Sequence, residues 1–105
     1  MNWFKQCFAP GLASYGATAY LTGNYVKAVA RIEKSISWLP QINESPEFIG
    51  ILGLSLIKIG KQHDAQPYLK MALENFNNIE PSENDETEFK QQLICDIENA
   101  LRNNT

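Results

Sequence analysis

The sequence predicts an all-α fold of two similar helical hairpins followed by a fifth, closing helix. The first observation is a set of small residues that recurs with the same internal steps. Its members are Gly16, Gly23, Ala28 and Ser35 and, 37 positions later in each case, Gly53, Gly60, Ala65 and Ala72. The second is that apolar residues recur at helical spacing, in segments that Gly and Pro separate. Because self-similarity at a period of roughly 20–50 residues is typical of stacked repeats, we expect a repeat architecture.

Length and composition predict a single domain over residues 1–105 with one modest core. The chain is 44% hydrophobic and 20% charged, with a formal net charge of −3. An acidic chain does not attract phosphate backbones, so nucleic acid is not an expected partner. The charge is uneven, since residues 79–105 hold seven acidic and two basic residues. This acidic C-terminal region is a candidate surface for a basic partner.

The two cysteines predict neither a metal site nor a redox motif. Cys7 and Cys95 lie far apart, and neither belongs to a CxxC motif. We expect two reduced, partly buried thiols in a cytoplasmic protein, with a disulfide only if the two ends of the chain meet. The first residues lack the pattern of a secretory signal, and the apolar run 48–59 is too short and interrupted to cross a bilayer. No contact with a membrane is expected.

Residues 1–8 carry apolar side chains that share one side of a helical turn. They are Trp3, Phe4, Cys7 and Phe8. We expect a short cap over the exposed end of the first hairpin, the alternative being an anchor for a membrane or a partner. Pro10 suits the first turn of a helix, which predicts a first helix over 10–22 that ends at Gly23 and Asn24.

Prolines bound the second and third helices. The second is predicted over 25–39, where Pro40 ends it. The third is predicted over 46–59, with Ser45 capping its free amides, Pro46 in its first turn and Glu47 at the positive end of its dipole. Because apolar residues occupy most of its circumference, this third helix should be central and buried.

The fourth helix is predicted over 62–78, after Gly60, with Pro67 in its first turns. Its expected buried stripe is Ala65, Leu69, Ala72, Leu73 and Phe76. A polar connection follows, in which Ser82 or Asn84 can cap a fifth helix over 84–103. That helix is polar except for one stripe, as a terminal element of a repeat array requires. The stripe is Phe89, Leu93, Ile94, Ile97 and Leu101.

The repeated small residues predict close contact between paired helices. Gly16 and Gly53 lie inside the first helix of each hairpin, where a glycine costs about 0.5–1 kcal/mol relative to alanine. Their repetition therefore implies a packing reason. We expect Ala28 and Ala65, in the second helix of each hairpin, to lie opposite these glycines.

These residues resemble the tetratricopeptide repeat (TPR) family. The first copy, residues 9–42, keeps the family pattern at Gly16, Gly23, Asn24, Tyr25, Ala28 and Pro40. The second copy, residues 46–79, keeps it at Gly53, Gly60, Ala65 and Ala72. The resemblance covers about two thirds of the chain and implies a superhelix of stacked hairpins that binds other proteins.

In that family the first helix of each hairpin lines a concave groove, which implies a set of partner-facing positions. They are Ala13, Ala17, Tyr20 and Leu21 in the first hairpin, and Gly50, Leu54, Ile57 and Lys58 in the second. Such a groove is apolar with one positive rim residue, and it suits an amphipathic helix or an apolar peptide. The alternative is that these side chains belong to the core or lie beneath the fifth helix.

No arrangement of residues predicts catalysis, a cofactor or a metal. His63 is the one histidine, and Asp64 beside it at a helix start does not face it. Cys95 has no partner that would orient it, and the acidic residues 83–88 lack the spacing of a calcium loop. We therefore expect no enzymatic activity.

The sequence thus predicts a non-enzymatic module that binds another protein or peptide in an apolar groove. Two alternatives stay open. A small inhibitor or immunity-type protein would cover a basic partner with residues 80–98. A structural homodimer would bury the apolar surface that an array of only two repeats leaves exposed.

Overall fold

The computed structural model describes residues 3–78 and 88–103. These residues form five α-helices and one 3-10 helix: α1 Trp3–Leu21, α2 Tyr25–Trp38, η1 Pro40–Glu44, α3 Pro46–Lys58, α4 Gln62–Asn78 and α5 Glu88–Asn103. No strand occurs in these two ranges, so the all-α class predicted from the sequence is confirmed.

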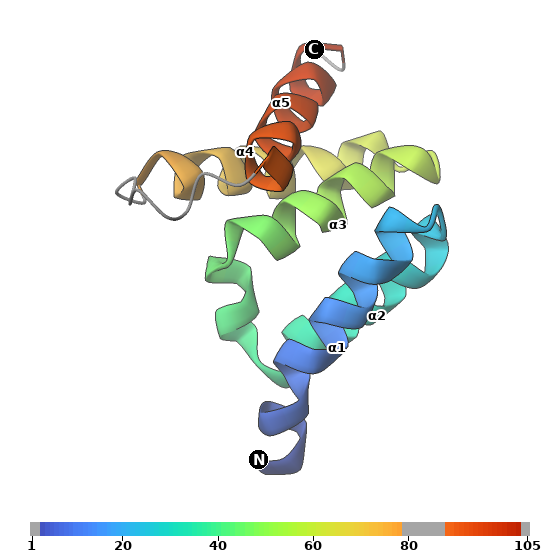
Figure 1. Cartoon of the computed structure of the whole chain (residues 1–105), viewed down its shortest axis with the longest axis vertical. Helices are drawn as coiled ribbons and strands as arrows, with labels where there is room; N and C mark the ends of the chain where they lie inside the picture. Colours follow the sequence, from blue (N-terminus) through green and yellow to red (C-terminus); the bar gives the residue numbers. More distant parts are fainter. Residues whose placement is uncertain (1–2, 79–87, 104–105) are drawn as a thin grey trace.

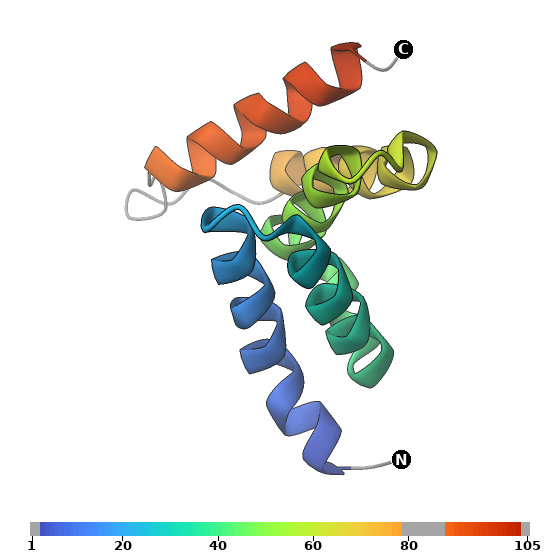
Figure 2. The ribbon, with the colours of Figure 1, turned by 90° about the vertical axis from the view of Figure 1, so that its right-hand side faces the viewer.

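The helices form two pairs, with α5 across the second pair (Figure 1). α1 packs along α2, and α3 packs along α4. α5 contacts α3 and α4, and Figure 2 shows it crossing the molecule at the end opposite the N-terminus. α3 contacts each of the other described helices. The prediction of a central third helix is confirmed, because every residue from Ile49 to Leu56 is buried.

The two hairpins make equivalent contacts at equivalent positions. A Cβ atom added to Gly16 would lie 2.6 Å from Ile32 Cγ1. A Cβ atom added to Gly53 would lie 2.7 Å from Leu69 Cδ2. The facing backbone oxygens are also near, those of Ala28 and Ala65 at 3.2 and 3.4 Å respectively. Both glycines thus allow two helices to approach, as their repetition predicted.

The two hairpin turns are also alike. Gly23 has a φ of 85° and Gly60 a φ of 87°, in the left-handed region that favours glycine. The amide that follows Gly23 donates to the carbonyl oxygen five residues earlier at 2.7 Å, and the amide that follows Gly60 does so at 2.8 Å. This is the Schellman pattern of helix ends, and it satisfies carbonyls that the helix leaves free.

The predicted boundary between an N-terminal cap and the first helix is wrong. A single helix, α1, runs from Trp3 to Leu21 with Pro10 inside it. A proline there removes one backbone hydrogen bond and bends the helix, and Figure 1 shows the first part of α1 turned away from the axis of the rest. Phe8 is 59% exposed, so it does not cover the hairpin.

Helix capping also differs from the prediction. Ser45 is the N-cap of α3, but its side chain makes no capping hydrogen bond, so its predicted role is wrong. Its backbone oxygen instead accepts from the Ile49 amide at 3.1 Å. Asn24, predicted only as a turn residue, caps α2 because its Oδ1 accepts from the Lys27 amide at 3.4 Å. The start of the fifth helix at residue 84 and its caps lie outside the described residues.

Candidate functional site

The positions of the predicted concave groove are divided between the interior and the surface. They fall into three groups by exposure: Ala13, Gly50 and Leu54 are buried, Ala17, Tyr20 and Ile57 are half-buried, and Leu21 and Lys58 are exposed. The three buried positions fit the alternative, in which such positions belong to the core or lie beneath the fifth helix. At Gly50 the covering element is α5, since a Cβ atom there would lie 2.7 Å from Ile97 Cδ1.

Tyr20 marks the place where α1 approaches α5. Its ring packs edge-to-face on Tyr25, with 5.7 Å between the ring centroids. Burial raises the pKa of Tyr20 above its ordinary value of 10.0, and the charge of Asp96 on α5 and then Tyr25 raise it further. A hydroxyl in this position resists losing its proton, because a phenolate would be poorly solvated beside a carboxylate.

We expect Tyr20 to ionise later than it does in the unfolded chain. Because the folded state favours neutral Tyr20, this residue contributes to the free energy of unfolding below pH 10. The contribution is lost as the pH rises through the raised pKa that Tyr20 has in the folded chain. Titration of tyrosine absorbance at 295 nm should therefore contain a late phase, and Tyr20→Phe should remove it. Tyr15→Phe, at an exposed tyrosine, is the matched control. A late phase that survives in Tyr20→Phe would contradict the assignment.

An open cavity lies between the second helices of the two hairpins. Its volume is about 720 Å³. Residues from α2, α3, α4 and the turn before α4 line it: Glu33, Ile36, Ser37, Leu56, Lys61, His63, Asp64, Pro67, Tyr68 and Met71. We call this the α2–α4 groove. A cavity of this size can accommodate a few side chains of a bound segment.

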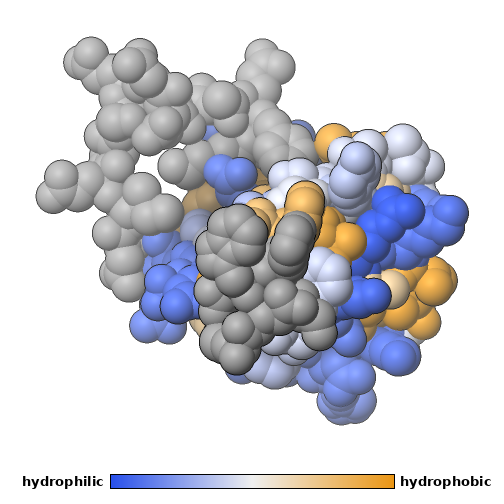
Figure 3. Space-filling view, turned by 90° about the horizontal axis from the view of Figure 1, so that it is seen from below, coloured by the Kyte–Doolittle hydropathy of each residue, from blue (hydrophilic) through white to orange (hydrophobic). Residues whose placement is uncertain are grey.

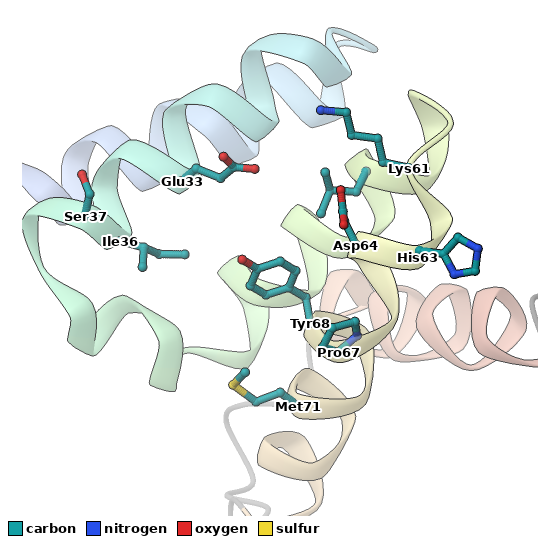
Figure 4. A pocket seen from close by; sticks show the side chains of 10 residues that line it. Glu33, Ile36, Ser37, Lys61, His63, Asp64, Pro67, Tyr68 and Met71 are labelled. Atoms are coloured by element: carbon teal, nitrogen blue, oxygen red, sulfur yellow. The ribbon is translucent and has the colours of Figure 1, made fainter.

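The α2–α4 groove combines an apolar floor with charged walls. Figure 4 shows Ile36, Tyr68 and Met71 directed into the space between α2 and α4. Glu33 points into it from α2, and Asp64 lies on the α4 side. Both carboxylates are exposed, and within the described ranges neither forms an ion pair. The groove therefore offers apolar contact area together with carboxylates that are free to bind a cation.

His63 and Asp64, neighbours at the start of α4, point in different directions. Figure 4 shows His63 directed away from the cavity, whereas Asp64 beside it lies toward the cavity. The prediction that these neighbours do not face each other is confirmed. In the described part of the chain, no three His, Cys, Asp or Glu residues are grouped so that they could hold a metal ion.

Sequence reasoning missed this groove because it followed the first helix of each hairpin. A signal was nevertheless present on α4. Ala65, Leu69, Ala72 and Phe76 already supply its buried stripe. Tyr68 and Met71 lie beside that stripe, and Met71 is 36% exposed. Tyr68 also packs against the core, so its ring connects the core with the surface at Met71.

Other surfaces carry weaker features. Among the residues whose side chains the structure describes, the exposed large apolar ones are Phe8, Tyr15, Leu21, Val26 and Met71. On the coloured part of the face seen in Figure 3, apolar areas alternate with hydrophilic ones. Cys7 and Cys95 are free and exposed, so the prediction of partly buried thiols is wrong. The acidic surface predicted over 80–98 lies partly outside the described residues.

Comparisons with protein-family models, with curated proteins and with solved structures give no match to this chain. Within the described ranges, no helix has both the length and the apolar character needed to span a bilayer.

Proposed function

We propose that this chain is a TPR-like, non-enzymatic interaction module made of two stacked repeats and a closing helix. The observation that carries the proposal is the equivalence of the two hairpins. Gly16 meets Ile32 as Gly53 meets Leu69, and the turns at Gly23 and Gly60 share one hydrogen-bond pattern. Repeats of this kind stack to present continuous surfaces for other proteins, which is what the module would do. It needs no cofactor for that role.

The binding site we propose is the α2–α4 groove, rather than the concave face predicted from the sequence. The concave positions are unsuitable because α5 packs on Gly50 and because Leu54 is 6% exposed. The α2–α4 groove instead presents Ile36, Tyr68 and Met71 beside the carboxylate of Glu33. Apolar side chains of a partner would fill the floor, and a lysine or arginine would pair with the carboxylate.

The proposed occupant is thus a short protein segment with bulky apolar side chains next to a basic one. The exposed, free thiols of Cys7 and Cys95 support a reducing compartment, such as the cytoplasm, for the complex.

Selection from a random peptide library displayed on phage, with the full chain as bait, tests this function. We expect enriched peptides to carry Lys or Arg beside apolar residues. Fluorescence anisotropy should then show about tenfold weaker binding to Glu33→Lys and to Met71→Asp, each of which removes one contact worth about 1–2 kcal/mol. Both residues are exposed, so neither change should disturb the core.

Leu21→Asp is the matched control, because Leu21 is exposed and belongs to the concave set. It should bind the selected peptides as the unmodified chain does. If Leu21→Asp loses binding and the two groove variants do not, the binding site is on the concave face. A library that yields no binder above background would count against an interaction module altogether.

A further inference from the structure

A second surface lies on α2, on a different face from the groove. Lys27, Arg31, Lys34 and Trp38 follow one another at steps of four, three and four residues, which places them along one stripe of the helix. Glu33, the carboxylate of the groove, lies off this stripe. We call Lys27, Arg31, Lys34 and Trp38, together with Tyr15 of α1, the basic stripe.

Aromatic rings hold two of the three cations in place. The Arg31 guanidinium carbon lies 5.9 Å from the centroid of the Tyr15 ring, and Arg31 Nη1 donates to the Tyr15 carbonyl oxygen at 3.4 Å. Lys34 Nζ lies 5.4 Å from the centroid of the Trp38 ring. A ring restricts where a cation lies without neutralising it. The cations are therefore positioned and still carry their full charge.

No carboxylate compensates these charges within residues 3–78 and 88–103. Lys27, Arg31 and Lys34 form no ion pair there. Lys27 and Lys34 are exposed, and Arg31 is half-buried. The chain has a formal net charge of −3, whereas this row of three unpaired cations makes the surface of α2 locally positive. A row of this kind attracts negative charge.

We propose that the basic stripe binds an acidic segment of a partner protein. At about 1.5 Å per residue, the three cations extend over about 10 Å of helix. Two carboxylates on alternate residues of an extended segment lie about 7 Å apart, so both fit within this length. Three cations on an otherwise acidic chain are too few for a nucleic-acid backbone. This inference does not depend on the α2–α4 groove, since the two surfaces differ in residues and in sign of charge.

Fluorescence anisotropy with the full chain tests the proposal. The probe is a fluorescein-labelled peptide of alternating Glu and Ala, and the same peptide with Gln in place of Glu is its uncharged control. We expect the acidic probe to bind at low salt and to dissociate as salt increases. Arg31→Gln/Lys34→Gln should weaken binding about fivefold or more, because two charged contacts are lost.

The matched control is Lys58→Gln/Lys70→Gln, which changes the net charge equally at two exposed lysines elsewhere. It should alter binding less than about twofold. Equal losses in the two double variants would overturn the proposal, as would equal binding of the acidic and uncharged probes. Tighter binding of a labelled oligothymidine would assign the stripe to nucleic acid instead. Light scattering gives the oligomeric state. An oligomer that is lost in Arg31→Gln/Lys34→Gln would mean that the basic stripe binds a second copy of this chain.

Discussion

Leu69→Ala is expected to lower the free energy of unfolding by about 2–5 kcal/mol. Leu69 is fully buried, and its side chain fills the space that Gly53 leaves at the crossing of α3 and α4. Truncation removes apolar contacts and leaves a cavity that the two backbones cannot close. Urea denaturation followed by helical circular dichroism measures the change, with an unchanged m-value as evidence that the unfolding reaction is the same.

A double-mutant cycle with Gly53 makes this prediction specific. A Cβ atom at Gly53 would lie 2.7 Å from Leu69 Cδ2 and 2.8 Å from Leu69 Cγ, so Gly53→Ala alone should destabilise the chain. In the Leu69→Ala background the same change should be neutral, or stabilising by up to about 1 kcal/mol, because alanine favours the helix. Additive effects would contradict the proposed contact.

Gly11→Ala is the matched control for the glycine substitution. Gly11 is exposed in α1, and nothing lies within 4 Å of an added Cβ atom. Alanine should therefore stabilise the chain slightly through its helix propensity. If Gly53→Ala behaves like Gly11→Ala, the close approach of α3 and α4 is not as described.

The hairpins were predictable because their requirements are local. Gly23 and Gly60 have the positive φ that a tight turn needs, and few other residues accept it. Gly16 and Gly53 recur at one offset because each faces one bulky side chain of the next helix. A requirement that involves two neighbouring helices and a short turn is visible in a single sequence.

Two predictions differ from the structure: the start of the first helix and the exposure of the concave face. Both depend on how the helices pack in the folded chain. Pro10 lies within α1 although its ring disfavours a helix interior, and Ala9 and Ala13 on both sides of it are fully buried. The concave face was assigned to a partner because nothing in the sequence says where a fifth helix docks. Gly50 carried part of that information. It stands 37 positions after Ala13, and the side chain it lacks would collide with Ile97.

Ile97→Ala tests the docking of α5 and is expected to cost about 2–5 kcal/mol of the free energy of unfolding. Ile97 is fully buried, and its Cδ1 atom occupies the place of the missing Gly50 side chain. Because a domain of this size is stable by only about 5–15 kcal/mol, such a loss is a large part of the total. Hydrogen exchange should show that the amides of α5 lose protection first. α5 packs on α3 and α4 but, unlike the other four α-helices, has no hairpin partner.

Glu98→Ala controls for changes in helix propensity, because Glu98 is the exposed neighbour of Ile97 on the same helix. It should change the free energy of unfolding by no more than about 0.5 kcal/mol. Gly50→Ala should destabilise the chain when Ile97 is present and have little effect when Ile97 is alanine, as two groups competing for one space require. An Ile97→Ala chain as stable as Glu98→Ala would mean that α5 is not docked on α3. The concave face would then be open, and it would replace the α2–α4 groove as the expected binding site.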